Sequence, residues 1–253
     1  MHRFFVPVED ISDQTIVIRS KEDVKHAVKA LRIQTGEEIE VSDGQGNEFV
    51  CQVTDLDQGL VEARIIEKST NQRESGVKVT LYQGLPKSDK LELIIQKVTE
   101  LGATEIVPLA LERCVVKLKD DKSTTKKLDR WNRIAYEAAK QSKRGVLPEV
   151  SKPMNLKQML DQMNRHDLVI VPYEGEQAQG IKGVLRAQPA KSVGIVIGSE
   201  GGFEQEEVEK LIAAGAKSVT LGPRILRTET AGIIATGIVQ YELGDLGGQV
   251  CNE

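Results

Sequence analysis

The sequence contains few cysteines and histidines, and their spacing excludes several kinds of site. Cys51, Cys114 and Cys251 are far apart in a chain of 253 residues and form no CxxC pair. The three histidines are equally scattered. We therefore expect neither a disulfide framework nor a metal site, and we interpret the cysteines as structural.

Long apolar runs are also missing. No segment approaches the roughly 20 apolar residues that cross a membrane, and residues 1–10 lack the apolar stretch of a signal peptide. The composition, 40% hydrophobic and 28% charged, is that of a globular protein. We expect a cytoplasmic protein with no membrane partner.

Acidic residues outnumber basic ones over the whole chain, but one segment has a large basic excess. The chain has 34 basic and 38 acidic residues, which taken alone argues against a nucleic-acid partner. Residues 1–72 hold 8 basic and 14 acidic side chains, whereas residues 113–144 hold 11 basic and 4 acidic ones. The basic segment predicts a surface for RNA phosphates, where Trp131 and Tyr136 either stack on bases or pack in the core.

The first part of the chain has the pattern of short strands. Segments rich in Val and Ile predict five strands, at residues 3–8, 15–19, 37–42, 48–54 and 60–67. One helix is expected to begin after Ser20, with Asp23 as its capping partner, and to end at Gly36. These features predict a small β-barrel-like domain over residues 1–72.

From residue 77 onward, strands alternate with helices. The predicted strands are 78–83, 105–109, 168–171, 193–197 and 218–221, and the predicted helices are 88–101, 124–142, 156–163, 205–214 and 230–243. This alternation predicts an α/β domain over residues 73–253, with a mostly parallel sheet and helices on both faces. Ligands bind such sheets at the loops that leave the carboxyl ends of the strands.

Three of these loops are distinctive: residues 173–176, 198–203 and 222–230. The pattern at 198–203 is not GxGxxG, and no GxxxxGK[ST] motif is present. The helix after Gly202 begins with acidic residues, which disfavours phosphate binding. Loop 198–203 therefore suits an adenosine without phosphates, unless its glycines only form a tight turn. Loop 222–230 is either a pocket wall with anion contacts or a capped helix with a solvated ion pair.

The strings GSEGGF at 198–203 and LGPRILRTETA at 221–231 resemble the paired signature of the RsmE family of ribosomal RNA uridine-N3 methyltransferases, in the SPOUT class. Residues 87–102 and 131–144 resemble that family's first and second motifs. Residues 3–5 and 26–32, with the turn at Asp43-Gly44, resemble its PUA-like RNA-binding domain. Ser199 replaces a usual proline, and Glu204 replaces a usual Ser or Thr.

The resemblance implies a fold, a cofactor and a substrate. The fold is a SPOUT trefoil-knotted α/β domain preceded by a PUA-like β-barrel, and the active form is a homodimer. The activity is S-adenosyl-L-methionine-dependent methylation of N3 of one uridine in 16S (small-subunit) ribosomal RNA, either free or in the assembled subunit. The alternatives are a SPOUT enzyme acting on another RNA or atom, and a non-catalytic RNA-binding module.

The resemblance also implies roles for individual residues. Arg227 stabilises the uracil anion, and the proton acceptor is Glu229, Glu200 or a water molecule. The expected cofactor-binding residues are Pro172, Ile197, Gly198, Glu200, Gly201, Leu221, Gly222, Ile225 and Leu226. The expected RNA-binding residues are Arg3, Arg32, Lys87, Lys90, Lys97, Arg133 and Arg144.

Overall fold

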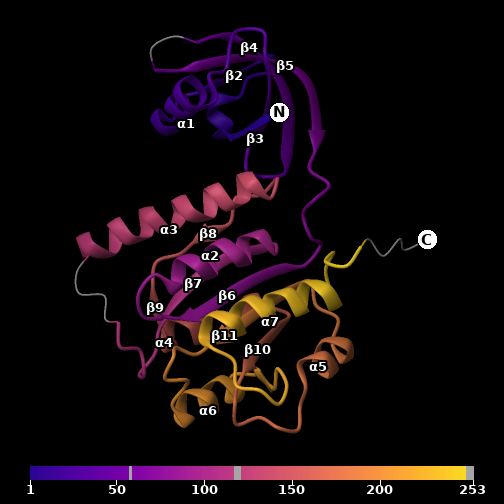
Figure 1. Cartoon of the computed structure of the whole chain (residues 1–253). Helices are drawn as coiled ribbons and strands as arrows, with labels where there is room; N and C mark the ends of the chain where they lie inside the picture. Colours follow the sequence, from indigo (N-terminus) through magenta and orange to yellow (C-terminus); the bar gives the residue numbers. More distant parts are fainter. Residues whose placement is uncertain (57–58, 117–120, 249–253) are drawn as a thin grey trace. The chain divides into compact units, whose positions relative to one another are not determined.

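The computed structural model describes residues 1–56, 59–116 and 121–248. It contains two compact units, drawn together in Figure 1. The first unit comprises Met1–Glu74 and Ala139–Leu147, and the second comprises Ser75–Ala138 and Pro148–Glu253. The first unit therefore includes a segment that lies far from residues 1–74 in the sequence.

A five-stranded sheet forms the first unit. Its strands are β1 (His2–Phe5), β2 (Thr15–Ile18), β3 (Glu38–Ser42), β4 (Asn47–Asp55) and β5 (Val61–Thr70), in the spatial order β1-β3-β4-β5-β2. Strand β1 is parallel to β3, and the other neighbours are antiparallel. Alternate residues such as Ile39 and Val41 are completely buried and form the core.

The helix of this unit begins where the sequence predicts but ends earlier. The Ser20 hydroxyl accepts a hydrogen bond from the Asp23 backbone N–H and caps α1 (Lys21–Lys25). A π-helical turn follows over His26–Leu31. The expectation that the helix continues to Gly36 is wrong, because Arg32 adopts a left-handed conformation (φ 54°) that ends the turn.

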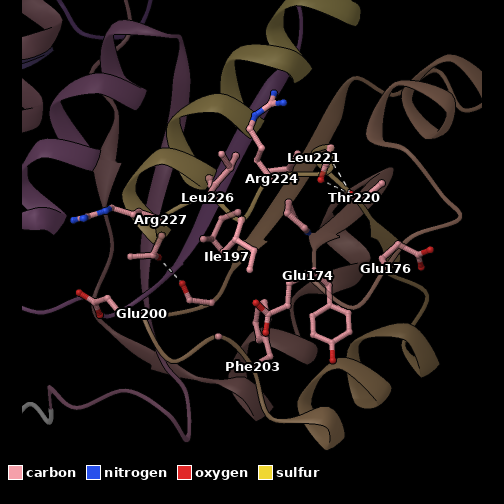
Figure 2. Close-up of a pocket in the computed structure, with 18 of the residues that line it drawn as sticks. Glu174, Glu176, Ile197, Glu200, Phe203, Thr220, Leu221, Arg224, Leu226 and Arg227 are labelled. Carbon is pink, nitrogen blue, oxygen red and sulfur yellow. Dashed lines mark hydrogen bonds between the residues drawn. The ribbon is translucent and has the colours of Figure 1, made fainter.

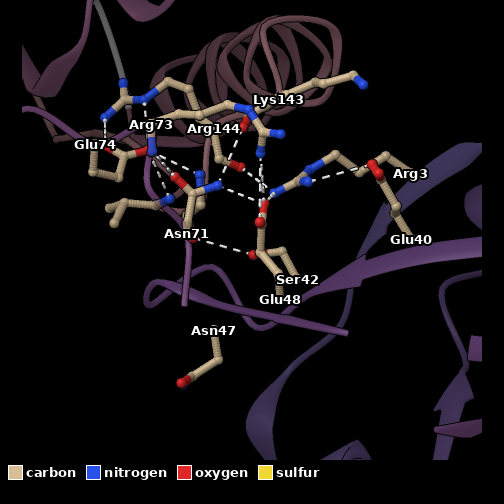
Figure 3. A network of polar contacts seen from close by, with 12 residues as sticks. Arg3, Glu40, Ser42, Asn47, Glu48, Asn71, Arg73, Glu74, Lys143 and Arg144 are labelled. Carbon is tan, nitrogen blue, oxygen red and sulfur yellow. Dashed lines mark hydrogen bonds and ion pairs between the residues drawn. The ribbon is translucent and has the colours of Figure 1, made fainter. Parts of the chain in front are cut away.

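A buried polar network holds residues 139–147 against the strands of the first unit (Figure 3). The Arg3 guanidinium donates to the Arg144 carbonyl oxygen at 2.6 Å and pairs with Glu48 at 2.7 Å. The Arg144 guanidinium pairs with Glu74 at 2.8 Å. Arg3 is only 8% exposed and Arg144 only 3%. Burial and these ion pairs engage both arginines within the first unit, so they do not favour the expectation that Arg3 and Arg144 contact RNA.

A parallel sheet forms the second unit, as the sequence predicts. Its strands, in the spatial order β12-β10-β11-β6-β7-β8 with β9 also pairing with β7, are all parallel to their neighbours. They are β6 (Lys78–Gly84), β7 (Ala103–Ala110), β8 (Glu149–Val150), β9 (Met154–Asn155), β10 (Leu168–Pro172), β11 (Ser192–Ile197) and β12 (Lys217–Val219).

The helices of this unit lie between the strands in the sequence, except for the last helix, which follows β12. They are α2 (Lys90–Glu100), α3 (Asp121–Gln141, whose last residues belong to the first unit), α4 (Leu156–Leu160), α5 (Ile181–Ala187), α6 (Gln205–Ala213) and α7 (Thr228–Glu242). Helices α2 and α7 lie side by side and cover the central strands (Figure 1). The sequence did not predict α5, β8 or β9. The trefoil knot implied by the resemblance stays a prediction.

A half-buried histidine lies where β10 begins. His166 Nε2 is 2.8 Å from the Tyr82 hydroxyl, and a Cβ on Gly194 would lie 2.9 Å from the imidazole ring. Burial, followed by the positive charge of Arg165, lowers the pKa of His166 to about 4. In the folded protein His166 is therefore neutral well below the pKa of about 6.5 that it has in an unfolded chain.

We predict that His166→Gln removes a component of acid destabilisation. Between pH 6.5 and pH 4 the unfolded chain binds a proton that the folded chain excludes, so the native protein loses stability as the pH falls. One proton contributes at most about 1.4 kcal/mol per pH unit. Unfolding by urea at pH 7, 5.5 and 4.5 measures this slope, and parallel profiles for the variant and the native protein would contradict the prediction.

Candidate active site

The three distinctive loops meet at one edge of the parallel sheet. Strands β10, β11 and β12 end at Pro172, Ile197 and Val219, and their exit loops enclose a cavity of about 860 Å³ (Figure 2). The carboxyl ends of neighbouring parallel strands meet at the same edge, so loops that are distant in the sequence share one cavity. The cavity is therefore where the sequence places ligand binding.

The loop after β11, residues 198–204, is held by backbone contacts. A Cβ on Gly84 would lie 2.6 Å from the Ser199 backbone nitrogen, so the end of β6 approaches this loop too closely for any side chain. The Thr228 hydroxyl donates to the Gly198 carbonyl oxygen at 2.5 Å and accepts from Gln83 Nε2 at 2.8 Å. These contacts fix the loop between β6 and the first turn of α7.

The loop after β12 combines an apolar wall with two arginines. Gly222 adopts a positive φ of 113°, which turns the chain back toward α7. Ile225 is 86% exposed, an unusual position for a large apolar side chain. Arg224 and Arg227 extend from the loop in different directions (Figure 2). Among the described residues, neither guanidinium has an ion-pair partner.

A cluster of paired charges lies beside the cavity. Lys90 Nζ is 3.1 Å from a Glu200 carboxylate oxygen and 3.2 Å from a Glu229 carboxylate oxygen. The Lys87 backbone N–H also donates to Glu200, at 3.0 Å. Burial raises the pKa of Glu200, but the hydrogen bonds from Lys87 and Lys90 outweigh it and hold this pKa below its usual range. Glu200 is thus a carboxylate that resists protonation.

Most of the expected cofactor-binding residues line the cavity. Those that do are Pro172, Ile197, Gly198, Glu200, Leu221, Gly222, Ile225 and Leu226, and the expected catalytic Arg227 lines it as well. Gly201 is not among the lining residues and faces Arg113 instead, since a Cβ there would lie 2.9 Å from Arg113 Cβ. Glu229 does not line the cavity and contacts Lys90.

The sequence-based reasoning missed several lining residues. The loop after β10 contributes Tyr173, Glu174 and Glu176, and the loop after β11 contributes Phe203. Both loops were predicted as distinctive exit loops, but these four side chains were not among the expected cofactor-binding residues. Thr228 was not identifiable from the sequence, because its role depends on a carbonyl oxygen 30 residues away in the sequence.

The expected RNA-binding residues have diverse surroundings. Arg32 and Lys87 are exposed. Lys97 pairs with Glu100, and Arg133 pairs with Glu137, in both cases within one helix. The buried Trp131 packs in the core, so it is not available to stack on a base. Part of the basic segment, residues 117–120, lies outside the described residues.

Other kinds of site find no support in the described ranges. No group of three or more His, Cys, Asp or Glu side chains there is arranged to hold a metal ion. None of the helices described has the length and apolar character needed to span a bilayer. Cys51 and Cys114 are buried, and burial raises the pKa of Cys51 to about 12. Cys251 lies outside the described residues.

Family models match both parts of the chain. A model described as RNA methyltransferase domain matches residues 73–240, and a model described as RNA methyltransferase PUA domain matches residues 20–66. The fold and the cavity thus belong to an RNA methyltransferase with a PUA domain. The chain is a methyltransferase.

Relatives specify the family. The ribosomal RNA small subunit methyltransferase E of Bacillus subtilis is 38% identical over 249 residues, 96% of this chain and 97% of the relative. The S-adenosyl methionine-bound crystal structure of the protein of the same name from Neisseria gonorrhoeae is 33% identical, with a TM-score of 0.86 over 97% of this chain and 99% of that one. A putative methyltransferase from Legionella pneumophila, solved with its cofactor SAM, is 32% identical, with a TM-score of 0.86 over 96% of this chain and 98% of that one. The chain belongs to the ribosomal RNA small subunit methyltransferase E family.

We predict that Thr228→Val destabilises the second unit by about 1–3 kcal/mol. The change leaves the Gly198 carbonyl oxygen and the Gln83 amide without their shared hydroxyl partner in a buried position. Thr236→Val is the matched control, because the buried Thr236 hydroxyl donates only to Gly232 within the same helix. Chemical unfolding compares the two variants, and equal losses of stability would contradict the prediction.

Proposed function

We propose that this chain transfers the methyl group of S-adenosyl-L-methionine to N3 of a uridine in small-subunit ribosomal RNA. The observation that carries the proposal is the cavity of about 860 Å³ at the exits of β10, β11 and β12, which has an apolar wall and is lined by Arg227, whose guanidinium has no ion-pair partner among the described residues. Relatives with the same name and a solved structure bound to S-adenosyl methionine support it. We place the reaction in the cytoplasm, where ribosomal RNA is made.

The cavity suits this cofactor better than a nucleotide with phosphates. Ile197, Leu221 and Leu226 offer an apolar surface to an adenine ring, and backbone groups of loop 198–204 lie beside them. The Ser199 hydroxyl is buried with no hydrogen-bond partner among the described residues. The carboxylates of Glu174 and Glu176 stand at the rim, where they favour the positive charge of a sulfonium over the negative charge of phosphates.

Residues of the chain supply the groups that the reaction needs. The cofactor, when bound, supplies an electrophilic methyl group. The uracil N3 must lose its proton, and the Arg227 guanidinium stabilises the negative charge that develops on the ring. Glu200 is a poor proton acceptor because its pKa is lowered. Glu229 does not line the cavity, so we propose that a water molecule carries the proton toward it.

The RNA is bound by exposed cations in both units. In the second unit these are Lys87 and the exposed basic residues of α3, among them Lys126 and Lys127. In the first unit Arg32 is exposed and itself adopts the left-handed conformation. We leave the buried Arg3 and Arg144 out of this surface. We retain the division into a PUA-like RNA-binding domain before residue 73 and a methyltransferase domain after it as part of the proposal.

A deletion strain tests the activity. We expect its small-subunit ribosomal RNA to lack one 3-methyluridine, and we expect the native chain to restore that nucleoside. Arg227→Ala should fail to restore it, because loss of one charge-stabilising donor costs roughly 10²–10³ in turnover. Mass spectrometry of digested nucleosides is the measurement, and assays on naked RNA and on assembled subunits identify the substrate. Retention of 3-methyluridine in the deletion strain would refute the proposal.

We also propose that the chain acts as a homodimer. Ile234 and Tyr241 are 44% and 64% exposed on α7, and Leu93 is 45% exposed on the neighbouring α2. Ile234 and Tyr241 are seven residues apart and lie on one face of the helix. Exposed apolar side chains gathered in this way favour a protein interface. The second copy is the occupant that the family resemblance implies.

The dimer is tested by one charge on this face. We predict that Ile234→Glu converts a dimer to a monomer in sedimentation analysis, because the interface would bury an unpaired carboxylate. Ile212→Glu is the matched control, since Ile212 is similarly exposed (47%) on α6. A native chain that sediments as a monomer, or a variant that stays dimeric, would contradict the proposal.

A further inference from the structure

The loop that follows β7 holds the loop that follows β11. Arg113 forms a fork with Glu204: its Nε is 2.8 Å from one carboxylate oxygen and its Nη2 is 3.0 Å from the other. The third nitrogen of the guanidinium, Nη1, donates to the Gly201 carbonyl oxygen at 3.0 Å. One side chain therefore uses all three nitrogens on residues 201–204, a geometry that only arginine provides.

A second contact joins the same two segments. The Glu112 backbone N–H donates to one oxygen of the buried Glu207 at 3.0 Å, and the Glu204 backbone N–H donates to the other at 2.9 Å. Glu204 is the N-cap residue of α6, and its backbone carbonyl oxygen accepts from the Glu207 backbone N–H at 3.0 Å, while both of its carboxylate oxygens accept from Arg113. A serine or threonine at this position could cap the helix but could not form the fork.

The opposite end of the loop is held by another carboxylate. Glu200 accepts from the Lys87 backbone N–H and pairs with Lys90, both of which follow β6. Residues 201–203 thus lie between two fixed points, the contacts of Glu200 and the contacts of Glu204. Gly202 and Phe203 lie in this span and line the cavity. The shape of that wall depends on both sets of contacts.

The exposure of the Arg113 and Glu204 side chains indicates that their ion pair contributes little to the stability of the fold. The side chains of Arg113 and Glu204 are 42% and 47% exposed, and ion pairs in such positions contribute little to the free energy of unfolding. The Gly201 contact is also too close to be incidental, because a Cβ on Gly201 would meet Arg113 Cβ at 2.9 Å. The contacts of Arg113 instead define the conformation of a loop that forms the cavity wall.

We propose that Arg113 is a positioning residue for S-adenosyl-L-methionine, which holds residues 201–204 in the conformation that binds the cofactor. This inference rests on the proposed function of the cavity. Arg113 does not line the cavity, so it acts through the backbone of Gly201 and the side chain of Glu204. Pre-organisation of a loop improves binding because less order is lost when the ligand arrives.

Calorimetric titration of the full chain with S-adenosyl-L-methionine tests the inference. We expect Arg113→Met to weaken binding, and to raise the KM for the cofactor, by roughly tenfold. At saturating cofactor kcat should stay within about threefold of the native value, and Tm should fall by no more than about 2–4 °C. Arg186→Met is the control, since the exposed Arg186 side chain also pairs with a carboxylate, Glu242, but at the other end of α7, and it should change neither constant.

A double-mutant cycle separates positioning from general damage. Glu204→Ser retains a residue that can cap the helix but removes the fork, so it should weaken binding about as much as Arg113→Met. The double variant should lose no more than either single one. Arg113→Lys should restore only part of the affinity, since an ammonium cannot reproduce the fork. Additive losses, or unchanged affinity in Arg113→Met, would overturn the inference. Failure of the native chain to bind the cofactor would instead refute the proposed function.

Discussion

The close approach of two backbones at the centre of the parallel sheet determines the geometry of the site. Gly84 at the end of β6 leaves no room for a side chain beside Gly198 and Ser199. The exit loop of β11 is therefore packed against β6 and cannot collapse into the space above β10 and β12. Thr228 extends this constraint to α7, because its hydroxyl bonds to the Gly198 carbonyl oxygen. The cavity lies where the packed backbone ends and the exit loops diverge.

Two groups of charged residues around the cavity differ in their contacts. The carboxylates of Glu200, Glu204 and Glu229 are engaged by cations of the chain itself, Lys90 and Arg113. These ion pairs hold the surrounding loops in place. Arg224 and Arg227 are the cations in the described part of the cavity wall that have no such partner. Glu174 and Glu176, in the loop after β10, also line the cavity, so its wall presents carboxylates that suit a sulfonium as well as the positive charge of Arg224 and Arg227.

The sequence predicts those features that depend on local pattern. The alternation of short apolar strands with helices predicted the parallel sheet and the exit loops after β10, β11 and β12, because each buried strand is a continuous apolar segment bounded by turn residues. Helix α5 was not predicted, since it is only seven residues long and contains Gly183. The first helix ends early because Arg32 adopts a left-handed conformation. Glycine and asparagine favour this conformation, so an arginine at the position does not predict it. The orientation of Gly201 toward Arg113 is a tertiary contact that no local pattern encodes.

The net charge of the first unit also depends on tertiary structure that the sequence does not reveal. A cut at residue 72 gives 8 basic and 14 acidic side chains, and this ratio argues against RNA binding. The compact unit also contains Arg73, Glu74 and residues 139–147, which bring it to 12 basic and 15 acidic side chains. Several of its acids are partners of its own buried or half-buried cations: Glu48 pairs with Arg3, Glu74 with Arg144, and Asp23 with Lys140. A buried cation requires such a partner. Each of these pairs takes one acid and one base out of the count together, so the pairs leave the net charge unchanged while they remove cations from the surface. The net charge of this unit therefore carries little information about its affinity for RNA, which depends on the cations left exposed.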